Sequence, residues 1–340
     1  MRIILVGFGV VGQSFVKLLM AREKDLVENF KIYPKIVAVI DSKGAALNPN
    51  GLNLKKILEV KKEKGSVSMD KENGVGKVEP VKLIEEVEAE VLVEVTPTNI
   101  VDGEPGLTHI KTALRTGKHV ITTNKGPLAL AMPALMELAQ YNNVYLKFSG
   151  CVGGGTPILE FAKRCLQGDK ILSFKGILNG TTNYILTKMT YENMSFNEAL
   201  AEAQKAGYAE ADPSMDVDGY DSACKLIILA NWILGLKKVL KDVKIKGIRE
   251  ISLEDIKKAL ERNCEIKLIA SANEELTVSP QLIPRTHPLC VGGVLNAVMF
   301  VSKYAGEETI IGRGAGGIET ASAILRDLLS IKKDLSKIYG

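Results

Sequence analysis

A short glycine-rich segment directly after the first apolar run restricts the fold of this chain more than any other feature. Residues 2–6 (RIILV) have the length and composition of a buried strand, and GFGVVG follows at once with Gly7, Gly9 and Gly12. The next residues, QSFVKLLMARE, carry apolar side chains at helical spacing. A G-x-G-x-x-G motif between a strand and a helix is typical of a Rossmann-type dinucleotide-binding domain.

The same motif predicts where the cofactor lies. The glycines allow a tight turn and close approach of the pyrophosphate, and the helix N-terminus offers free N–H groups. We expect the whole turn to contact the cofactor: Gly7, Phe8, Gly9, Val10, Val11 and Gly12. A second strand-like run, KIVAVI, ends at Asp41, whose carboxylate can accept hydrogen bonds from the adenosine ribose of NAD. Lys43 could instead meet the 2′-phosphate of NADP, so the choice between the two cofactors stays open.

Two further strand-like runs, AEVLVEVTPTN and HVITTNKGPLA, flank a helical segment. The carboxyl ends of parallel strands face the ligand crevice of such a sheet. This places five residues beside the cofactor: Thr96, Pro97, Thr123, Asn124 and Lys125. For the threonines, ordinary turn capping is the alternative. NVYLKFSG is predicted to be the last strand of this domain.

The composition changes at CVGGGTP, which marks a junction between domains. A strand (ILSFKGI), a turn with hydroxyl side chains and a helix from near Thr181 follow, and TIIGRGAGGIETASAILRDLLS then repeats a strand, a glycine turn and a helix. This last segment contains Gly316, which we expect to bind the cofactor, and it can return to the first domain to close over the nicotinamide. We therefore predict an α/β protein with a nucleotide-binding domain at 1–150, completed by the C-terminal helix within 311–340, and a second domain at 151–310.

An acidic stretch, GYAEADPSMDVDGYDSACKL, suggests three kinds of site: a calcium loop, a charged surface or an active site. Its five carboxylates precede a single lysine: Glu210, Asp212, Asp216, Asp218 and Asp221, then Lys225. In an EF-hand alignment Lys225 falls on the twelfth position, where the loop needs a bidentate glutamate. The sequence therefore excludes a calcium loop of this type.

What remains is a helix beginning near Gly219, on which Asp221 and Lys225 are four residues apart and share one face. A surface ion pair of this kind contributes under about 1 kcal/mol. The following run, SACKLIILANWIL, is strongly apolar, which favours a lysine that points into a cleft. A lysine among carboxylates can donate a proton to a carbonyl oxygen.

Composition excludes several other classes of function. The 44 basic and 40 acidic residues leave a net charge of +4, too balanced to predict nucleic-acid binding. The longest apolar run, 226–236, is too short to span a bilayer, and glycines interrupt the opening residues, which argues against a signal peptide. Five cysteines without a C-x-x-C pair favour a reducing cytoplasm.

Four segments together resemble the homoserine dehydrogenases: TTNKGPLA, NGTTNYIL, the acidic stretch, and THPLCVGGVLNAV with GRGAGGIETASAILRDL. They occur in family order over nearly the whole chain. The resemblance implies a Rossmann-type domain and a mixed-sheet α/β domain for catalysis and dimerisation, in the short form without a regulatory domain. It also implies that NAD or NADP serves the interconversion of L-homoserine and L-aspartate 4-semialdehyde, a step towards threonine, methionine and isoleucine.

Roles for individual residues come from the same resemblance. Lys225 would be the general acid, with Asp216 and Asp221 fixing the substrate and orienting the lysine, and Glu210 would hold the substrate ammonium. Gly180 and Thr181 would contact the substrate, and Lys125 would lie between cofactor and substrate. Asp212 and Asp218 are expected to be turn and capping residues.

The chain departs from the family pattern at Ser149, where relatives carry a glutamate that helps to bind a monovalent cation. The backbone carbonyls of Val152, Gly154 and Thr156 could still bind sodium. Arg313 and Glu319 also replace residues usual in the family.

Two rival functions are open at this stage. One is an acylating aldehyde dehydrogenase with Cys151 as its nucleophile, which would need His109, His119 or His287 as a base. The other is a non-catalytic nucleotide sensor, which would have no use for Lys225.

Overall fold

The computed structural model describes residues 1–339, with side chains to residue 336. The chain divides into two compact units. Unit 1 comprises Met1–Cys151 and the C-terminal segment from Gly316, and unit 2 comprises Val152–Ala315. The second boundary lies five residues later than the sequence prediction, because the last strand of unit 2 continues to Arg313.

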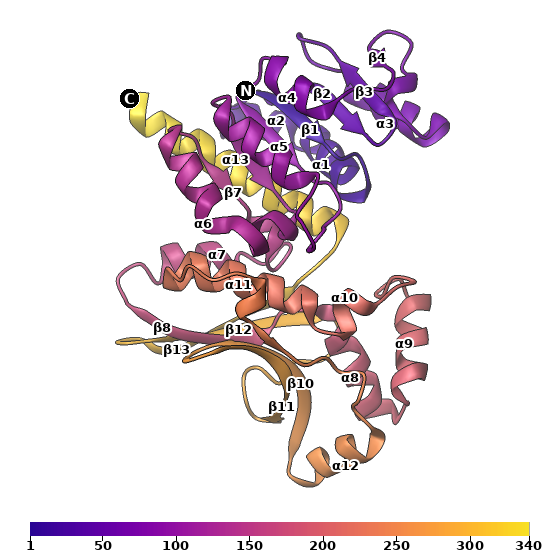
Figure 1. The fold of residues 1–340 in the computed structure, drawn as a ribbon. Coiled ribbons are helices and arrows are strands. Elements are labelled where there is room, and N and C mark those ends of the chain that lie inside the picture. The colour runs from indigo at the N-terminus through magenta and orange to yellow at the C-terminus, as the bar shows by residue number, and fades with distance from the viewer. Residues whose placement is uncertain (340) are drawn as a thin grey trace. The chain divides into compact units, whose positions relative to one another are not determined.

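Unit 1 is built on a seven-stranded sheet with the order β4-β3-β2-β1-β5-β6-β7 (Figure 1). Five neighbouring strands, β2-β1-β5-β6-β7, pair in parallel, whereas β3 and β4 add an antiparallel edge. The strands are β1 (Arg2–Val6), β2 (Lys35–Asp41), β3 (Gly44–Leu47), β4 (Gly74–Val75), β5 (Val91–Glu94), β6 (His119–Thr122) and β7 (Leu146–Lys147). The chain runs outward from β1 to β2 and then crosses back to β5, so β1 and β5 form the point where the strand order reverses, the usual place of a ligand in such sheets.

Helices connect the strands of unit 1. They are α1 (Val10–Ala21), α2 (Glu23–Glu28), α3 (Leu54–Lys64), α4 (Pro80–Glu86), α5 (Gly106–Arg115), α6 (Lys125–Tyr141) and the C-terminal α13 (Gly317–Tyr339), with short 3₁₀ turns at Val67–Met69 and Ser149–Cys151.

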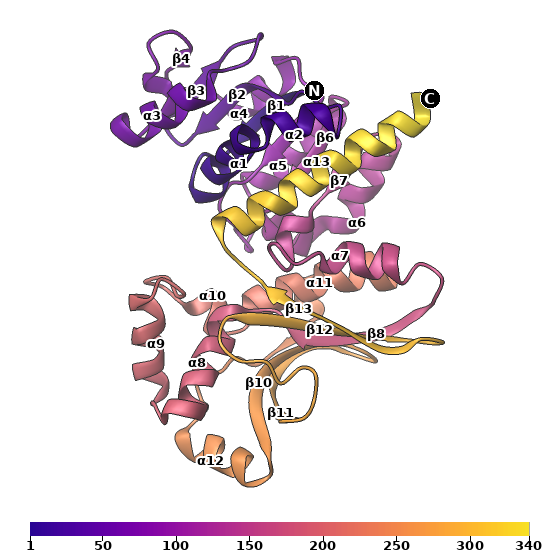
Figure 2. The same cartoon turned by 180° about the vertical axis from the view of Figure 1, so that it is seen from behind.

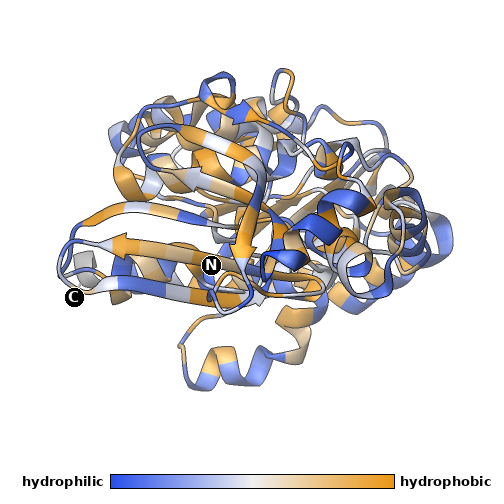
Figure 3. Cartoon of the chain, turned by 90° about the horizontal axis from the view of Figure 1, so that it is seen from below, coloured by the Kyte–Doolittle hydropathy of each residue, from blue (hydrophilic) through white to orange (hydrophobic). Residues whose placement is uncertain are grey.

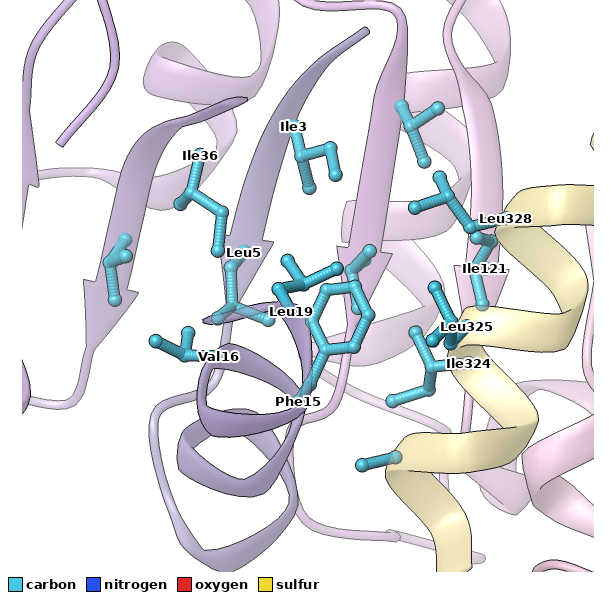
Figure 4. Close-up of a cluster of buried hydrophobic side chains, with 14 of the residues drawn as sticks. Ile3, Leu5, Phe15, Val16, Leu19, Ile36, Ile121, Ile324, Leu325 and Leu328 are labelled. Atoms are coloured by element: carbon cyan, nitrogen blue, oxygen red, sulfur yellow. The ribbon is translucent and has the colours of Figure 1, made fainter. Parts of the chain in front are cut away.

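The core of unit 1 joins segments from both ends of the chain. Figure 4 shows Phe15 of α1 between Leu5 of β1 and Ile324 of α13, and all three side chains are fully buried. Side chains alternate along a strand, so Ile4 and Leu92 point to the opposite face of the sheet and are buried there as well. Both faces of the parallel strands are therefore covered, which explains their unbroken apolar runs.

A buried carboxylate holds α13 against the rest of unit 1. Asp327 on α13 accepts hydrogen bonds from the backbone N–H of Ser149 at 2.8 Å and from its hydroxyl at 2.6 Å. Both residues are buried. Helix α13 thus brings a buried carboxylate to Ser149.

Unit 2 contains a six-stranded mixed sheet with the order β13-β12-β8-β10-β11-β9. All neighbouring pairs are antiparallel except β11 with β9. The strands are β8 (Ile171–Ile177), β9 (Lys244–Ile245), β10 (Cys264–Ala272), β11 (Leu276–Pro284), β12 (Leu295–Ser302) and β13 (Gly306–Arg313). The predicted mixed α/β fold of the second domain is confirmed.

The helices of unit 2 are α7 (Ile158–Glu160), which continues as a π-helical segment (Phe161–Cys165), α8 (Gly180–Glu192), α9 (Phe196–Lys205), α10 (Ser214–Val217), α11 (Tyr220–Leu234) and α12 (Leu253–Glu261), with a 3₁₀ turn at Leu240–Asp242. In Figures 1 and 2, α7 and α11 lie together along one side of this sheet. Most helices carry both hydrophilic and hydrophobic segments (Figure 3). In the described part of the chain, no helix combines the length and hydrophobicity needed to cross a membrane.

We predict that Asp327→Ala lowers the free energy of unfolding by about 2–4 kcal/mol, because it leaves two buried donors of Ser149 without their acceptor. Asp334→Ala on the same helix is the control, since it removes a partly exposed ion pair with Lys147 and should cost under about 1 kcal/mol. Urea unfolding measures both changes. Equal losses in the two variants would contradict the anchoring role of Asp327.

Candidate functional site

The glycine turn after β1 has the geometry that a pyrophosphate requires. Gly7 has a φ of +100°, and a Cβ there would lie 2.5 Å from the carbonyl oxygen of Val95, so only glycine fits. A Cβ at Gly9 would meet nothing within 4 Å, which leaves the backbone open to a ligand. Helix α1 starts at Val10 without a side-chain cap, so its first N–H groups can bind an anion. The turn therefore fits a dinucleotide.

The other residues of the turn have different surroundings. The Phe8 side chain is buried, whereas Val10 is 75% exposed at the start of α1. Gly316 precedes α13, and a Cβ on the next residue, Gly317, would lie 2.8 Å from Val10. The structure thus brings the N-terminal ends of α1 and α13 together in unit 1.

The carboxylate of Asp41 is already bound by other groups of the protein. Its carboxylate accepts hydrogen bonds from the ammonium of Lys61 (2.7 Å), the hydroxyl of Ser66 (2.9 Å) and the amides of Lys43 (2.9 Å) and Val67 (3.0 Å). Burial alone raises the pKa of Asp41, but these four donors outweigh it, so its pKa lies below the ordinary value. Ribose binding by Asp41 stays a prediction, and a ribose hydroxyl would have to compete with these donors.

The carboxyl ends of β5 and β6 meet as the sequence predicts. The side-chain amide of Asn124 donates to the Thr96 hydroxyl and the Pro97 carbonyl, both at 3.2 Å. Its oxygen accepts from Gly126 N–H at 3.1 Å and so caps α6, which begins at Lys125. Thr123, on the same loop, is tied through its backbone amide to the carbonyl of Glu94.

The acidic stretch of unit 2 forms α10 and the start of α11, and it buries its lysine. Lys225 is only 6% exposed. Its ammonium donates to Asp221 and to the backbone carbonyl of Leu178, both at 2.7 Å. The predicted pair on one helix face is confirmed, and it is buried rather than on the surface.

Asn179, between β8 and α8, is a residue that the sequence reasoning missed. Its side-chain amide donates to Asp216 at 2.6 Å and to Asp221 at 2.9 Å, and its oxygen accepts from the Thr182 amide at the start of α8. An asparagine directly before a predicted helix is an N-cap signal that could have revealed it.

Asp216 lies in an environment that disfavours its charge. Burial, followed by the neighbouring Asp221 carboxylate, raises its pKa above the ordinary value, while Asn179 and Lys225 act in the opposite direction. A positively charged ligand would stabilise the ionised form of a carboxylate in such an environment. The cluster of Lys225, Asp221, Asp216 and Asn179 is therefore suited to a polar molecule that carries a cation and an oxygen needing a proton.

Of the remaining predicted residues of unit 2, Thr181 also contacts this cluster, through a side-chain hydrogen bond with Asp216. The Thr181 hydroxyl donates to the Tyr208 carbonyl at 2.6 Å, and a Cβ at Gly180 would lie 2.8 Å from the carbonyl of Val294. Glu210 is exposed, and its backbone carbonyl accepts a hydrogen bond from the side-chain amide of Gln204 at 3.0 Å. Substrate contacts for these residues stay predictions.

The two acids set aside as turn residues differ from each other. Asp212 accepts from the Ser214 amide at 3.0 Å, as a turn residue does, whereas the side chain of Asp218 pairs with Arg249.

The loop proposed to bind sodium also stays a prediction. Its carbonyl at Thr156 accepts from the Ile158 amide at 2.9 Å, and the Thr156 hydroxyl donates to the Arg313 carbonyl at 3.1 Å. Over residues 1–339, no group of three or more His, Cys, Asp or Glu side chains could hold a metal. A cation here would thus depend on backbone oxygens.

Cys151 is buried, and its thiol donates to the Thr122 carbonyl at 3.4 Å. The ring nitrogens of His119 and His287 accept from the backbone amides of Tyr145 and Leu289. These contacts favour a packed thiol over a catalytic nucleophile.

We predict that Asp216→Asn makes the protein more stable than the wild type at neutral pH, although it weakens activity. A carboxyl with a raised pKa binds its proton more tightly in the folded state, so wild-type stability falls as the pH rises above 3.8, the ordinary pKa. The variant lacks this fall, and its advantage should disappear as the pH is lowered towards 3.8. Urea unfolding between pH 4 and pH 8 measures the difference. A variant that is less stable than the wild type at every pH would contradict the conclusion that the ionised form of Asp216 destabilises the folded state.

Comparisons with known proteins agree with this geometry. The family model described as homoserine dehydrogenase matches residues 157–329, and the homoserine dehydrogenase NAD binding domain matches residues 7–149. A homoserine dehydrogenase from Methanocaldococcus jannaschii is 46% identical, with 99% of this chain and 100% of the relative covered. An NAD(+)-dependent homoserine dehydrogenase from Pseudomonas canavaninivorans is 39% identical, with coverage of 99% and 97%.

A solved structure extends the similarity to the fold. A hyperthermophilic archaeal homoserine dehydrogenase in complex with NADPH has a TM-score of 0.86 and 30% identity, and 98% of each chain is covered. Family match, identity and fold thus agree over nearly the full length, and the chain belongs to the homoserine dehydrogenase family.

Proposed function

We propose that the protein catalyses the reversible NAD(P)-dependent interconversion of L-homoserine and L-aspartate 4-semialdehyde, with Lys225 as the general acid and base. The observation that carries this proposal is the buried ammonium of Lys225, held by Asp221 and by the Leu178 carbonyl. Such a reaction serves the biosynthesis of threonine, methionine and isoleucine.

The carboxylates account for the recognition of an amino-acid substrate. L-Homoserine carries an ammonium group, and Asp216 lies where a cation relieves its repulsion with Asp221. The exposed carboxylate of Glu210 would supply a second contact for the ammonium. Gly180 and Thr181 open α8, and their position supports a role in contacting the substrate.

Lys225 donates or accepts the single proton of the reaction. The bound dinucleotide supplies or accepts a hydride, which leaves one proton to be exchanged at the substrate oxygen. In reduction Lys225 donates this proton to the carbonyl oxygen, and in oxidation its neutral amine removes it from the hydroxyl. Asp221 and Leu178 fix the nitrogen by two short hydrogen bonds, which limits the directions in which it can transfer the proton. Lys125, at the start of α6, would assist at the cofactor.

We also propose that the protein acts as a homodimer in the cytoplasm. The five cysteines are all free thiols, which suits a reducing compartment. Strand β13 forms an edge of the sheet of unit 2 and exposes nearly half of Ile311, which supports a second copy as its partner.

We expect Lys225→Ala to lower kcat for homoserine oxidation by a factor of about 10² to 10⁴, the usual contribution of a positioned acid or base. Binding of NADPH, measured by fluorescence, should stay unchanged. The control is Lys244→Ala, an exposed lysine of unit 2 paired with Glu275, which should alter kcat less than about twofold. Full activity in Lys225→Ala would contradict the role of the lysine, and no activity in the wild type with either cofactor would contradict the reaction.

The dimer is tested separately by sedimentation equilibrium at micromolar concentration. We expect a mass twice that of the chain. A single-chain mass at the concentration of the activity assay would contradict the dimer and would leave the reaction as proposed.

A further inference from the structure

Unit 1 contains a fully buried carboxylate to which the reaction as proposed assigns no role. Glu94 is the last residue of β5 and is 0% exposed. A carboxylate in such a place is costly unless its oxygens accept hydrogen bonds. The donors to Glu94 come from the two strand ends where the cofactor is expected.

One oxygen of Glu94 holds the turn after β5. Its Oε1 accepts from the backbone N–H of Thr96 at 3.0 Å and from the Thr96 hydroxyl. Because that hydroxyl donates its proton to Glu94, its lone pairs are free to accept from the Asn124 amide at 3.2 Å. The carboxylate thus fixes the orientation of the Thr96 hydroxyl, which then accepts from Asn124.

The other oxygen holds the end of β6. Its Oε2 accepts from the hydroxyl of Thr122 at 3.0 Å, and this hydroxyl in turn accepts from the backbone N–H of Asn124, also at 3.0 Å. Asn124 is therefore fixed through its backbone by one oxygen of Glu94 and through its side chain by the other. It also caps α6, so the position of Lys125 depends on the same carboxylate.

A buried histidine completes the surroundings. Nδ1 of His109 on α5 lies 4.0 Å from Oε1 of Glu94, and both side chains are almost wholly buried. His109 Nδ1 has no hydrogen-bond partner in the described structure, so the imidazole faces the carboxylate without binding it directly.

We propose that Glu94 is a positioning residue for the cofactor: its carboxylate locks the ends of β5 and β6 in one arrangement and so pre-orders Thr96, Asn124 and Lys125 for the nicotinamide half of NAD(P). The proposal rests on the proposed cofactor site. A merely structural carboxylate would stabilise unit 1 without affecting cofactor affinity. A positioning carboxylate affects both, because without it Thr96, Asn124 and Lys125 are no longer held in the arrangement that the cofactor needs. It also affects kcat, since a displacement of about 1 Å can lower a rate by a factor of about 100.

The test is Glu94→Gln, which keeps the shape but replaces one acceptor oxygen by a donor. We expect the Kd for NADPH, measured by fluorescence titration, to rise about tenfold or more, with kcat reduced and KM for homoserine at saturating cofactor changed less than about twofold. Glu265→Gln is the matched control, since Glu265 is also a buried carboxylate, 3% exposed, and it lies in unit 2. It should lower the melting temperature without changing the Kd for NADPH.

A second variant tests the hydrogen bonds that run from Glu94 through the Thr96 hydroxyl to Asn124. It also replaces the first test if Glu94→Gln does not fold. Thr96→Val removes one donor and leaves the carboxylate in place, and it should also weaken NADPH binding. In the double variant the two effects should be far from additive, because they break one network. Additive effects, or an unchanged Kd for NADPH in folded Glu94→Gln or in Thr96→Val, would overturn the proposal. Wild-type protein that binds NADPH but does not oxidise homoserine would refute the proposed reaction alone.

Discussion

The two short hydrogen bonds of the Lys225 ammonium connect the elements of unit 2 that form the candidate site. They join α11, which carries the lysine and Asp221, to the end of β8 at Leu178. Asn179 then connects the same carboxylate to Asp216 and to the first turn of α8. Removing the Asp221 carboxylate would leave the buried ammonium of Lys225 without its partner charge, which typically costs about 3–5 kcal/mol. The group that we propose to perform the chemistry therefore also joins the end of one strand to three helices.

A common principle operates inside each unit. Glu94 and Asp327 in unit 1, like Asp221 in unit 2, are buried carboxylates that accept hydrogen bonds from residues far away in the sequence. Each occupies a junction between elements rather than the middle of the apolar core. Apolar packing holds the sheets and helices together without fixing the direction of any polar group. The carboxylates supply that direction, which a binding site needs.

Features with a local pattern were predictable from the sequence. The Gly7–Gly12 turn, the order of strands and helices, and the pair of Asp221 with Lys225 each depend on residues a few positions apart. Contacts between distant residues were not: Ser149 and Asp327 are separated by 178 positions, and no local spacing indicates that they meet. The proposed role of Glu94 was hidden for the same reason, since it depends on a contact with Thr122, 28 positions away. For Asp41 the sequence suggested a ligand contact, but it could not reveal how many protein donors surround that carboxylate.

The packing of the C-terminal helix into the core of unit 1 affects the order in which the two units fold. Unit 2 is one continuous segment, whereas the core of unit 1 needs α13, more than 300 residues after β1. During synthesis the first 151 residues leave the ribosome with the α13-facing sides of α1 and β1 uncovered, and they remain so while all of unit 2 emerges. The nucleotide-binding unit, although first in the sequence, is therefore the last to complete its fold. Until α13 arrives, the apolar surface that it covers stays exposed, and surfaces of this kind are prone to aggregation.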